Sequence, residues 1–377
     1  MKIGRVSPDV IVVGAGAIGS SIAYQLAKAG LKVMVFERGQ VGGEATGASA
    51  GMIQRHHGRD TTPAFAALAE ESARLFPALA DELRDRTGTD IGYRSAGRLQ
   101  VAFSESDERA LRAERAWEAD RGAVVPWLDA AAVQVAEPAV NTAVRGAIYH
   151  ADEYQLLPLA FAQTLARAAA DLGAVVREGA AIDHLRIESE RVVGVELTGE
   201  SVLAGEVVIA NGSWAGAWSH ALGVSIPVRP ARGQMVALRT PRTALRTVIS
   251  AAAGYALTKP DGVTLVGTTV EDAGFDSRPT AAAIGALLAS AAQLAPRLAD
   301  ATVVGAWAGL RPRTPDGMPL IGRVGAREGV ILATGHFRQG ILLAPITGEL
   351  VADLVLGRRP RLPLDTFDPT RFLVRAA

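Results

Sequence analysis

Short apolar runs at the start of the chain predict a strand, a helix and a second strand. Residues 9–13 form an apolar run between a proline and a glycine, which predicts a buried strand. Residues 18–29 have helical character and stop before a glycine, a common helix terminator. Residues 32–37 repeat the pattern of a buried strand. Strand, helix and strand in this order predict a parallel, right-handed unit.

Longer periodic stretches predict helices through the first half of the chain. One is expected over residues 63–86, kinked at Pro77 and ended at Gly88. Residues 105–120 form an amphipathic pattern, and a further helix is expected over 158–173. Short alternating segments predict strands at 97–103, 181–188, 191–197 and 205–212.

The second half is richer in strand patterns until the chain nears its end. Strand-like segments fill residues 227–310, with one Ala-rich helix near 280–295. A strand at 329–335, a turn and a helix at 344–357 follow. Nucleotide-binding α/β units therefore occur at the start, middle and end, with β-rich insertions between them. We expect two discontinuous domains, one made of residues 1–88, 148–226 and 311–377 and the other of 89–147 and 227–310.

Composition and charge exclude several functional classes. The 377 residues carry 39 Lys and Arg against 39 Asp and Glu, so nothing suggests nucleic acid as a partner. With no cysteine, disulfides, thiolate metal sites and cysteine nucleophiles are excluded, which fits a cytoplasmic protein. No apolar stretch is long enough to predict a membrane span. The first residues, a basic start followed by an apolar stretch, also resemble a secretory signal peptide. A dinucleotide-binding turn explains their glycine spacing better.

The glycines at the start have the spacing G-x-G-x-x-G between the first predicted strand and helix. Gly14 permits a tight turn, Gly16 lets the backbone approach a pyrophosphate, and Gly19 allows close packing of helix and strand. The helix N-terminus then favours a phosphate. Glu37 ends the second strand, where a carboxylate accepts hydrogen bonds from ribose hydroxyls and repels a 2′-phosphate. The pattern predicts a dinucleotide other than NADP.

The fingerprint does not separate NAD from FAD, but two other segments favour FAD. Residues 41–52 are small, with Thr46 and Ser49 among them, and would let backbone amides approach a pyrophosphate and ribityl chain. An ordinary surface loop is the alternative. Residues 334–345, TGHFRQGILLAP, form a turn before a helix. Backbone N–H groups of 338–342 would stabilise negative charge on a reduced flavin ring, unless the turn only caps the helix.

Five motifs distributed along the chain carry a family resemblance: the N-terminal fingerprint, GGEATGASAGM, GYRSAGRLQVAFSESD, WAGLRPRTPDGMPLIG and TGHFRQGILLAPITGELVADL. They resemble the D-amino-acid oxidase superfamily of flavoproteins, most closely its glycine oxidase branch, which serves thiamine biosynthesis. The resemblance implies an α/β fold with a Rossmann-like FAD-binding domain and a discontinuous β-rich (α+β) substrate domain. It also implies non-covalent FAD, a cytoplasmic location and a homo-oligomer, which is a tetramer in the family.

The resemblance implies roles for individual residues. Arg311 matches an arginine that binds the substrate carboxylate, Tyr255 a tyrosine that donates to the same carboxylate, and Arg338 an arginine at the flavin and substrate edge. A larger set matches residues that contact the cofactor. In this set the backbone of Ile182 matches the one that contacts the adenine. The set is Gly14, Gly16, Ala17, Ile18, Gly19, Glu37, Arg38, Ala45, Thr46, Ala50, Gly51, Met52, Ile182 and the turn His336, Phe337, Arg338, Gln339, Gly340, Ile341 and Leu342.

Some positions depart from the family pattern. Val270 stands where a glycine oxidase can carry methionine, and Ala253 replaces a larger residue, so the pocket is expected to be roomier than one built for glycine alone. Ala48 lies near the position where some relatives attach flavin to histidine, which supports non-covalent binding. The six histidines are scattered without ligand spacing, so no metal site is expected.

The implied activity is oxidation of glycine or another small amino acid or amine. A hydride would pass to flavin N5, molecular oxygen would accept the electrons, and the products would be a 2-oxo acid, ammonia and hydrogen peroxide. The alternatives are a D-amino-acid or amine dehydrogenase that reduces a quinone or carrier protein, a tRNA-modifying flavoprotein, and a flavin-binding subunit of a hetero-oligomer. The zero net charge argues against the tRNA-modifying flavoprotein.

Overall fold

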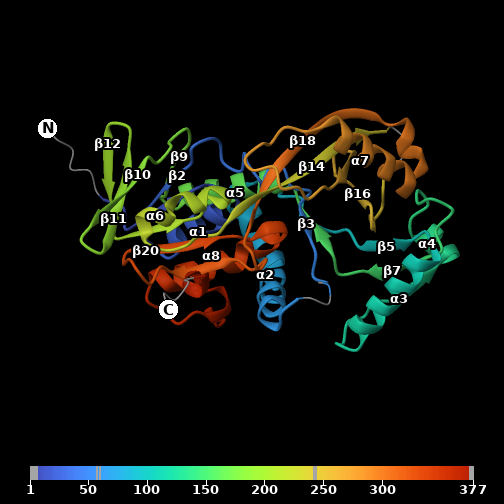
Figure 1. Ribbon diagram of the computed structural model, residues 1–377, viewed down its shortest axis with the longest axis horizontal. Coiled ribbons are helices and arrows are strands. Elements are labelled where there is room, and N and C mark those ends of the chain that lie inside the picture. The colour runs from blue at the N-terminus through green and yellow to red at the C-terminus, as the bar shows by residue number, and fades with distance from the viewer. Residues whose placement is uncertain (1–6, 57, 59–60, 241–243, 373–377) are drawn as a thin grey trace.

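The computed structural model describes residues 7–56, 58, 61–240 and 244–372. Two large sheets form the two halves of the molecule (Figure 1), one of six strands and one of eight. Short three-stranded sheets accompany them. This arrangement confirms the α/β class expected from the sequence, with a Rossmann-like parallel sheet beside a β-rich mixed sheet.

The six-stranded sheet has the order β19-β20-β13-β1-β2-β9, and all neighbours pair in parallel except β19 with β20. Val10 and Val12 of β1 face one apolar cluster, whereas Ile11 and Val13 face another on the opposite side. Burial on both faces explains why these strands are apolar throughout rather than alternating. The strands are β1 Val10–Val13, β2 Val33–Phe36, β9 Val175–Arg177, β13 Glu206–Ile209, β19 Leu320–Arg323 and β20 Val330–Thr334.

Four helices cover the face that carries Val10 and Val12, and α1 packs between α5 and α8. They are α1 Ala17–Lys28, α2 Pro63–Thr87, α5 Pro158–Asp171 and α8 Gly340–Val355. The opposite face is covered by a small antiparallel sheet and by short helical turns after β13. These are β10 His184–Glu188, β11 Arg191–Leu197, β12 Glu200–Leu203, η1 Gly212–Trp218 and α6 Ser219–Leu222.

The helix ends follow local capping rules. Thr62 caps α2, which continues through Pro77 and ends at Gly88 in a left-handed conformation (φ 70°), the end expected from the sequence. The helix expected at residue 344 begins at Gly340 instead. A proline is typical of a first helical turn, but Pro345 lies in the second turn of α8, because the short turn η3 Phe337–Gln339 leads directly into the helix.

The eight-stranded sheet has the order β18-β14-β17-β16-β15-β5-β7-β6. Its two longest strands, β14 and β18, pair antiparallel along their length and extend towards the six-stranded sheet (Figure 1). Helix α7 Ala281–Leu294 packs against one face. The strands are β5 Arg98–Ala102, β6 Trp127–Asp129, β7 Gly146–His150, β14 Arg229–Arg239, β15 Val248–Ala251, β16 Gly254–Thr258, β17 Val263–Gly267 and β18 Thr302–Arg313.

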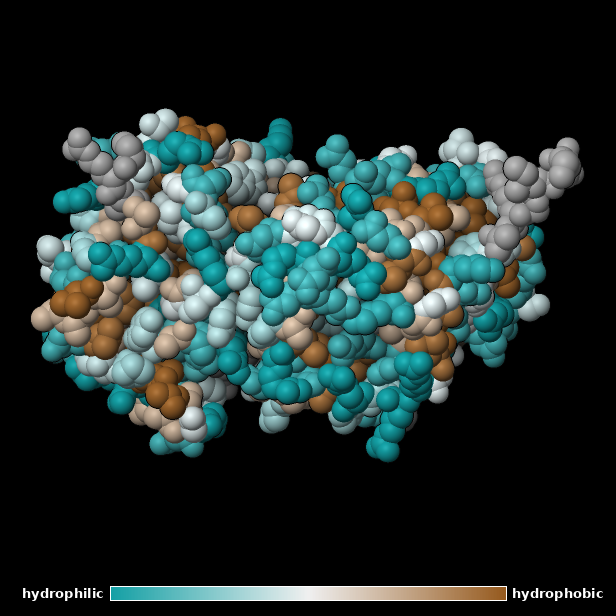
Figure 2. All heavy atoms as spheres, turned by 180° about the vertical axis from the view of Figure 1, so that it is seen from behind, coloured by the Kyte–Doolittle hydropathy of each residue, from teal (hydrophilic) through white to brown (hydrophobic). Residues whose placement is uncertain are grey.

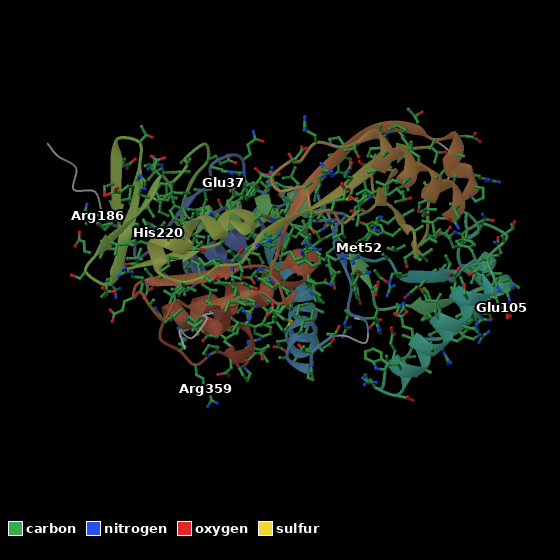
Figure 3. All side chains as sticks on the ribbon, in the orientation of Figure 1. Glu37, Met52, Glu105, Arg186, His220 and Arg359 are labelled. Carbon is green, nitrogen blue, oxygen red and sulfur yellow. The ribbon has the colours of Figure 1, made fainter. Side chains whose placement is uncertain are left out.

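Remaining elements join or flank these halves. A short sheet lies where the two halves meet, and Figure 3 places Met52 of its first strand there, with Glu37 in one half and Glu105 at the far end of the other. Its strands are β3 Met52–Ile53, β4 Arg94–Ser95 and β8 Tyr154–Gln155. The other helices are α3 Glu105–Ala119, α4 Ala130–Ala136, η2 Pro296–Asp300, η4 Asp365–Phe367 and η5 Pro369–Phe372.

The two-domain division stays a proposal, for which the two large sheets offer a basis. Strand β7 spans the boundary proposed at residue 148, and β18 spans the one proposed at 311. Among the described residues, no helix combines the length and apolar character that a membrane crossing requires. Figure 2 shows hydrophobic residues on the rear face in separate groups among hydrophilic ones.

Candidate cofactor and substrate site

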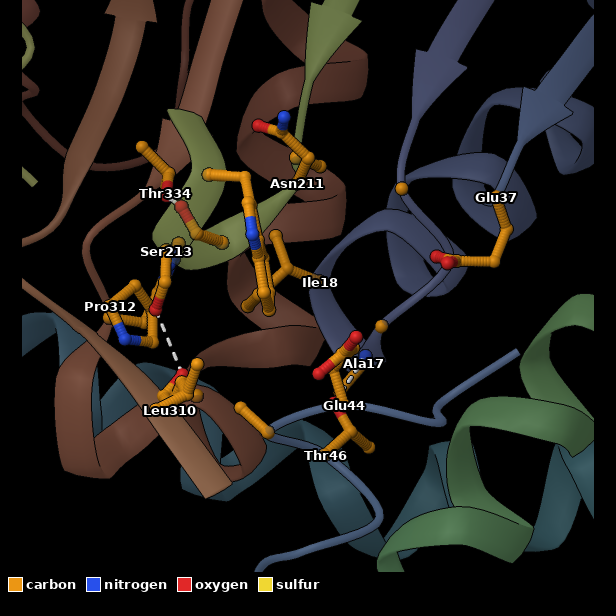
Figure 4. Close-up of a pocket in the computed structure, with 18 of the residues that line it drawn as sticks. Ala17, Ile18, Glu37, Glu44, Thr46, Asn211, Ser213, Leu310, Pro312 and Thr334 are labelled. Carbon is orange, nitrogen blue, oxygen red and sulfur yellow. Dashed lines mark hydrogen bonds between the residues drawn. The ribbon is translucent and has the colours of Figure 1, made fainter. Parts of the chain in front are cut away.

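A cavity of about 530 Å³ opens at the carboxyl ends of the parallel strands β1, β2 and β13. This is the edge at which ligands bind in open α/β sheets. The β1–α1 turn, the loop after β2, the end of β13, the end of β18 and the turn before α8 line the cavity. Figure 4 shows Ala17 and Glu37 on one side of it and Leu310 and Pro312 on the other.

The glycine fingerprint folds as its spacing predicts. Gly14 has a φ of 98°, and a Cβ there would lie 2.8 Å from the carbonyl oxygen of Ala210. A Cβ on Gly19 would overlap the carbonyl oxygen of Gly14, so helix and strand can pack this closely only with glycine. Both positions require glycine for the packing of the turn itself.

Thr46 lies against the start of α1. Its Oγ1 accepts a hydrogen bond of 3.0 Å from the backbone N–H of Ala17 and would lie 3.2 Å from a Cβ on Gly16. The loop after β2 is therefore held against the helix N-terminus, where backbone N–H groups and the helix dipole favour a phosphate.

Glu37 at the end of β2 is buried and fixed by backbone donors. Its two carboxylate oxygens accept hydrogen bonds from Ala15 N–H at 2.9 Å and Gly39 N–H at 2.8 Å. Next to it, the guanidinium of Arg38 stacks at 3.6 Å from the ring of Trp214 and pairs with Glu44 at 2.5 Å. These contacts hold the Glu37 carboxylate and the Arg38 guanidinium at one end of the cavity.

Three buried polar atoms of the lining have no hydrogen-bond partner among the residues that the structure describes. They are Ser49 Oγ, Asn211 Oδ1 and Trp218 Nε1. A buried polar atom without a partner is destabilising by about 1–3 kcal/mol. Donors and acceptors on an extended polar ligand such as a dinucleotide would satisfy them. Together with the glycine turn, they fit a dinucleotide such as FAD.

The turn before α8 forms the wall at the other end of the cavity. Phe337 has a φ of 47°, which is unusual for a residue with a side chain. The turn that contains it leads directly into α8, which begins at Gly340. His336 is buried, its Nε2 lies 3.1 Å from Thr347 Oγ1, and burial lowers its pKa to about 3. The histidine is therefore neutral, and the helix N-terminus supplies the positive potential here.

Arg311, Tyr255 and Arg338 come from β18, β16 and η3 but act on one another electrostatically. Burial raises the pKa of Tyr255, although the two nearby arginines oppose the shift, so its hydroxyl keeps its proton. Burial lowers the pKa of Arg311, Tyr255 opposes this, and the like charge of Arg338 adds to it. The group combines two cations with a phenol that can donate.

The guanidinium of Arg311 is held by neutral oxygens rather than by a carboxylate. Nη1 donates to the carbonyl of Thr269 at 3.1 Å, and Nη2 donates to Thr268 Oγ1 at 2.8 Å. Within the described part of the chain, neither Arg311 nor Arg338 has an ion-pair partner, and both line the cavity. An uncompensated pair of arginines at the cavity wall is suited to a carboxylate ligand.

The expected site residues divide into those that line the cavity and those that do not. Lining the cavity are Gly14, Gly16, Ala17, Ile18, Glu37, Arg38, Ala45, Thr46, Ile182, Arg311, His336, Phe337, Arg338, Gly340 and Ile341. Not part of the lining are Gly19, Ala50, Gly51, Met52, Tyr255, Gln339 and Leu342. Gln339 instead borders a smaller neighbouring cavity.

Several residues that line the cavity were assigned no role from the sequence. Asn211 and Trp214 follow β13, and Ser213 donates to the carbonyl of Leu310 at 2.8 Å, which ties this segment to β18 (Figure 4). A signal was present, because 205–212 was predicted as a strand and the carboxyl ends of parallel strands meet at one edge. The conformation of the η1 turn determines which side chains after β13 point into the cavity.

Comparison with known proteins agrees with this geometry. The family model described as "FAD dependent oxidoreductase" matches residues 9–354. The chain is 37% identical over 367 residues to glycine oxidase of Geobacillus kaustophilus, covering 97% of each chain. It superposes on the crystal structure of that enzyme with a TM-score of 0.92, covering 97% of this chain and 98% of the other. Iminodiacetate oxidase of Chelativorans sp. is 28% identical, with a TM-score of 0.88 and coverage of 96% and 98%.

Proposed function

Because the chain belongs to the family of FAD-dependent oxidoreductases that includes the glycine oxidases, we propose that it oxidises glycine or another small amino acid or amine with molecular oxygen. The proposal depends most on Arg311, a cavity-lining guanidinium that pairs with no carboxylate among the described residues. Bound FAD, held without a covalent bond, would accept a hydride from the substrate α-carbon and pass two electrons to oxygen.

Arg311 and Tyr255 bind the substrate carboxylate in this proposal. Thr268 and Thr269 hold the guanidinium from one side, which leaves its remaining N–H groups for the two carboxylate oxygens. Tyr255 keeps its proton because burial raises its pKa, so its hydroxyl is a donor to the same anion. Both contacts orient the α-carbon without taking part in bond breaking.

The charge around the substrate favours the reactive form of its amine. Arg338 and Arg311 place two positive charges at this end of the cavity, and like charge lowers the pKa of a bound ammonium. His336 is neutral and paired with Thr347. Two of the three cavity-lining carboxylates, Glu37 and Glu44, lie at the fingerprint end, and the third, Asp183, directly precedes β10. A neutral amine that loses a hydride from its α-carbon needs no side-chain base.

The products follow from the balance of atoms. Loss of a hydride and a proton converts the amino acid to an imine, and water then releases a 2-oxo acid and ammonia. Oxygen takes up the two electrons and two protons as hydrogen peroxide. Similarity to iminodiacetate oxidase supports including secondary amines that carry a carboxylate among the substrates to be tested.

The test is a panel of amino acids and amines, with glycine, both alanine enantiomers, sarcosine and iminodiacetate included. We expect anaerobic bleaching of the flavin absorbance and, in air, peroxide equal to the substrate consumed. Rapid anaerobic bleaching with slow reoxidation by air and fast dye reduction would instead identify a dehydrogenase. If no compound in the panel bleaches the flavin, the proposed function is wrong.

A further inference from the structure

Two histidines and a glutamate from distant parts of the chain meet outside the cofactor cavity. His56 follows β3, Glu118 lies in the last turn of α3, and His150 ends β7. Each offers one ligand atom that lies within 4.8 Å of the other two. None of the three lines the cofactor cavity. Their spacing along the sequence gave no metal signature, so only the fold brings them together.

The distances within this cluster fit a tetrahedral metal ion. Glu118 Oε2 lies 3.1 Å from His150 Nε2 and 3.5 Å from His56 Nδ1. An ion with bonds of about 2.0–2.1 Å to its ligands holds tetrahedral ligand atoms about 3.3–3.4 Å apart. The two separations from Glu118 lie on either side of that value, and the ligand nitrogens of His56 and His150 lie within 4.8 Å of each other.

Asp152 has the place of an outer-shell residue in such a site. Its Oδ1 lies 2.6 Å from His56 Nε2, the ring nitrogen opposite the one that faces Glu118. A carboxylate on the far nitrogen fixes the ring and its tautomer, so that Nδ1 presents its lone pair to an ion. Asp152 is held in turn by Arg55, whose Nη1 lies 3.5 Å from Oδ2.

The cluster is shielded from solvent. His150 is fully buried, the Glu118 side chain is 4% exposed and the His56 side chain 12%. We propose that His56, Glu118 and His150 bind a divalent transition-metal ion, with zinc as the best match to two imidazoles and a carboxylate, and that Asp152 orients His56. A water molecule would complete the coordination.

The ion would join the edge of the eight-stranded sheet to the segment after β3. His56 also borders the smaller cavity, which reaches Phe337, Arg338 and Gln339 of the turn before α8. Metal binding would therefore fix a segment that lies beside the substrate end of the cofactor site. This inference does not depend on the substrate proposed above.

The alternative is an ion-pair cluster in which a protonated His56 bridges two carboxylates. Burial alone would lower the pKa of His56, but its hydrogen bonds with Asp152 and Glu118 raise it to about 9. His150 Nε2 lies 3.1 Å from Glu118 Oε2, and its Nδ1 is buried without a hydrogen-bond partner among the described residues. A metal titration distinguishes the two, because an ion-pair cluster takes up no ion.

The experiment is titration of the purified holoenzyme, after chelator treatment, with Co²⁺ followed by its visible absorption bands, and then with competing Zn²⁺. We expect tetrahedral Co²⁺ bands that saturate at one ion per chain and disappear with Zn²⁺. Zn²⁺ should also raise the midpoint of thermal unfolding. If the wild-type protein gives no such bands and no Zn²⁺ stabilisation, the cluster is an ion pair and the proposal is overturned.

Variants then identify the ligands. His56→Gln, at the most exposed of the three positions, should abolish the bands, whereas Asp152→Asn should weaken Co²⁺ binding by about 10- to 100-fold. His184→Gln on β10 is the matched control, because this exposed histidine lies in a different sheet and should leave binding unchanged. Saturable binding that survives His56→Gln would place the ion elsewhere and overturn the assignment.

Discussion

Gly233 on β14 leaves open the space that the guanidinium of Arg311 on β18 occupies. A Cβ built on Gly233 would overlap Nη1 and Cζ of Arg311. The two strands pair along their length, with Ala231 opposite Arg311 and Gly309 opposite Gly233, so the overlap cannot be relieved without disturbing the sheet. A missing side chain on one strand therefore sets the direction of the charged group on the next.

We expect Gly233→Ala to displace the Arg311 guanidinium and lower kcat/KM for an amino acid by about 100-fold, the size of effect that misplacing a positioning group by about 1 Å produces. FAD content should stay unchanged. Steady-state kinetics with flavin quantification measures both. Gly305→Ala, on β18, is the control, because a Cβ there would only reach Trp307 at 3.8 Å. Equal losses in both variants would contradict a specific effect on Arg311.

Replacing Arg311 itself tests the carboxylate site. Truncating one partner of a buried charge pair typically costs about 2–5 kcal/mol, so Arg311→Ala should lower kcat/KM for an amino acid by roughly 30- to 5,000-fold. Arg311→Lys keeps the charge but loses the planar fork, so it should recover only part of the loss. A carboxylate-free amine of similar size is the control. If it loses as much activity as the amino acid, Arg311 does not bind the carboxylate.

The first residue of α8 should contact the cofactor. Gly340 lines the cavity, and a Cβ on it would meet nothing in the protein closer than 3.9 Å. Any loss caused by Gly340→Ala would thus come from the ligand side, where overpacking of about 1–3 kcal/mol corresponds to roughly 5- to 150-fold weaker FAD binding. Apoprotein titration with FAD measures this. Gly285→Ala in α7, where the Cβ would enter open space, should bind FAD normally. Unchanged affinity in Gly340→Ala would place the flavin away from this turn.

Lys259 should make stability depend on pH. It is buried, and its Nζ donates to Gln155 Oε1 at 3.1 Å and to the carbonyl of Leu156 at 2.9 Å. Burial, with the nearby charge of Arg94 adding to it, lowers its pKa from 10.5 to about 7. Between these values the unfolded chain binds a proton that the folded protein does not. The free energy of unfolding therefore falls as pH decreases from about 10.5 to 7, by at most about 1.4 kcal/mol per pH unit.

Denaturant unfolding of wild type and Lys259→Met at several pH values checks this. The variant also leaves two buried acceptors without a donor, which shifts its stability by a constant amount, so the readout is the slope against pH and not the stability itself. We expect the wild-type curve to be steeper in this range. Parallel curves would show that Lys259 keeps its ordinary pKa.

Local signals in the sequence determined much of the fold and part of the site. The strand, helix and strand at the start and the end of α2 at Gly88 follow from local sequence patterns. The glycine fingerprint is also readable from its spacing, although Gly14 packs against the distant Ala210 as well. Motif spacing also indicated the turn before α8, although not the start of that helix. Such features are readable because the residues that stabilise them are neighbours along the chain.

Only the tertiary structure decided which distant side chains meet. Gly233 lies on β14, Arg311 lies on β18 and Thr268 directly follows β17, and the pairing of β14 with β18 and β17 places them together. The meeting of His56 with His150 likewise depends on how the segment after β3 lies against β7. Hydrophobic periodicity sets which face of an element is buried but not which elements become neighbours. Strand order and packing of the whole core fix that choice, and with it the cation group of the site and the histidine cluster beside it.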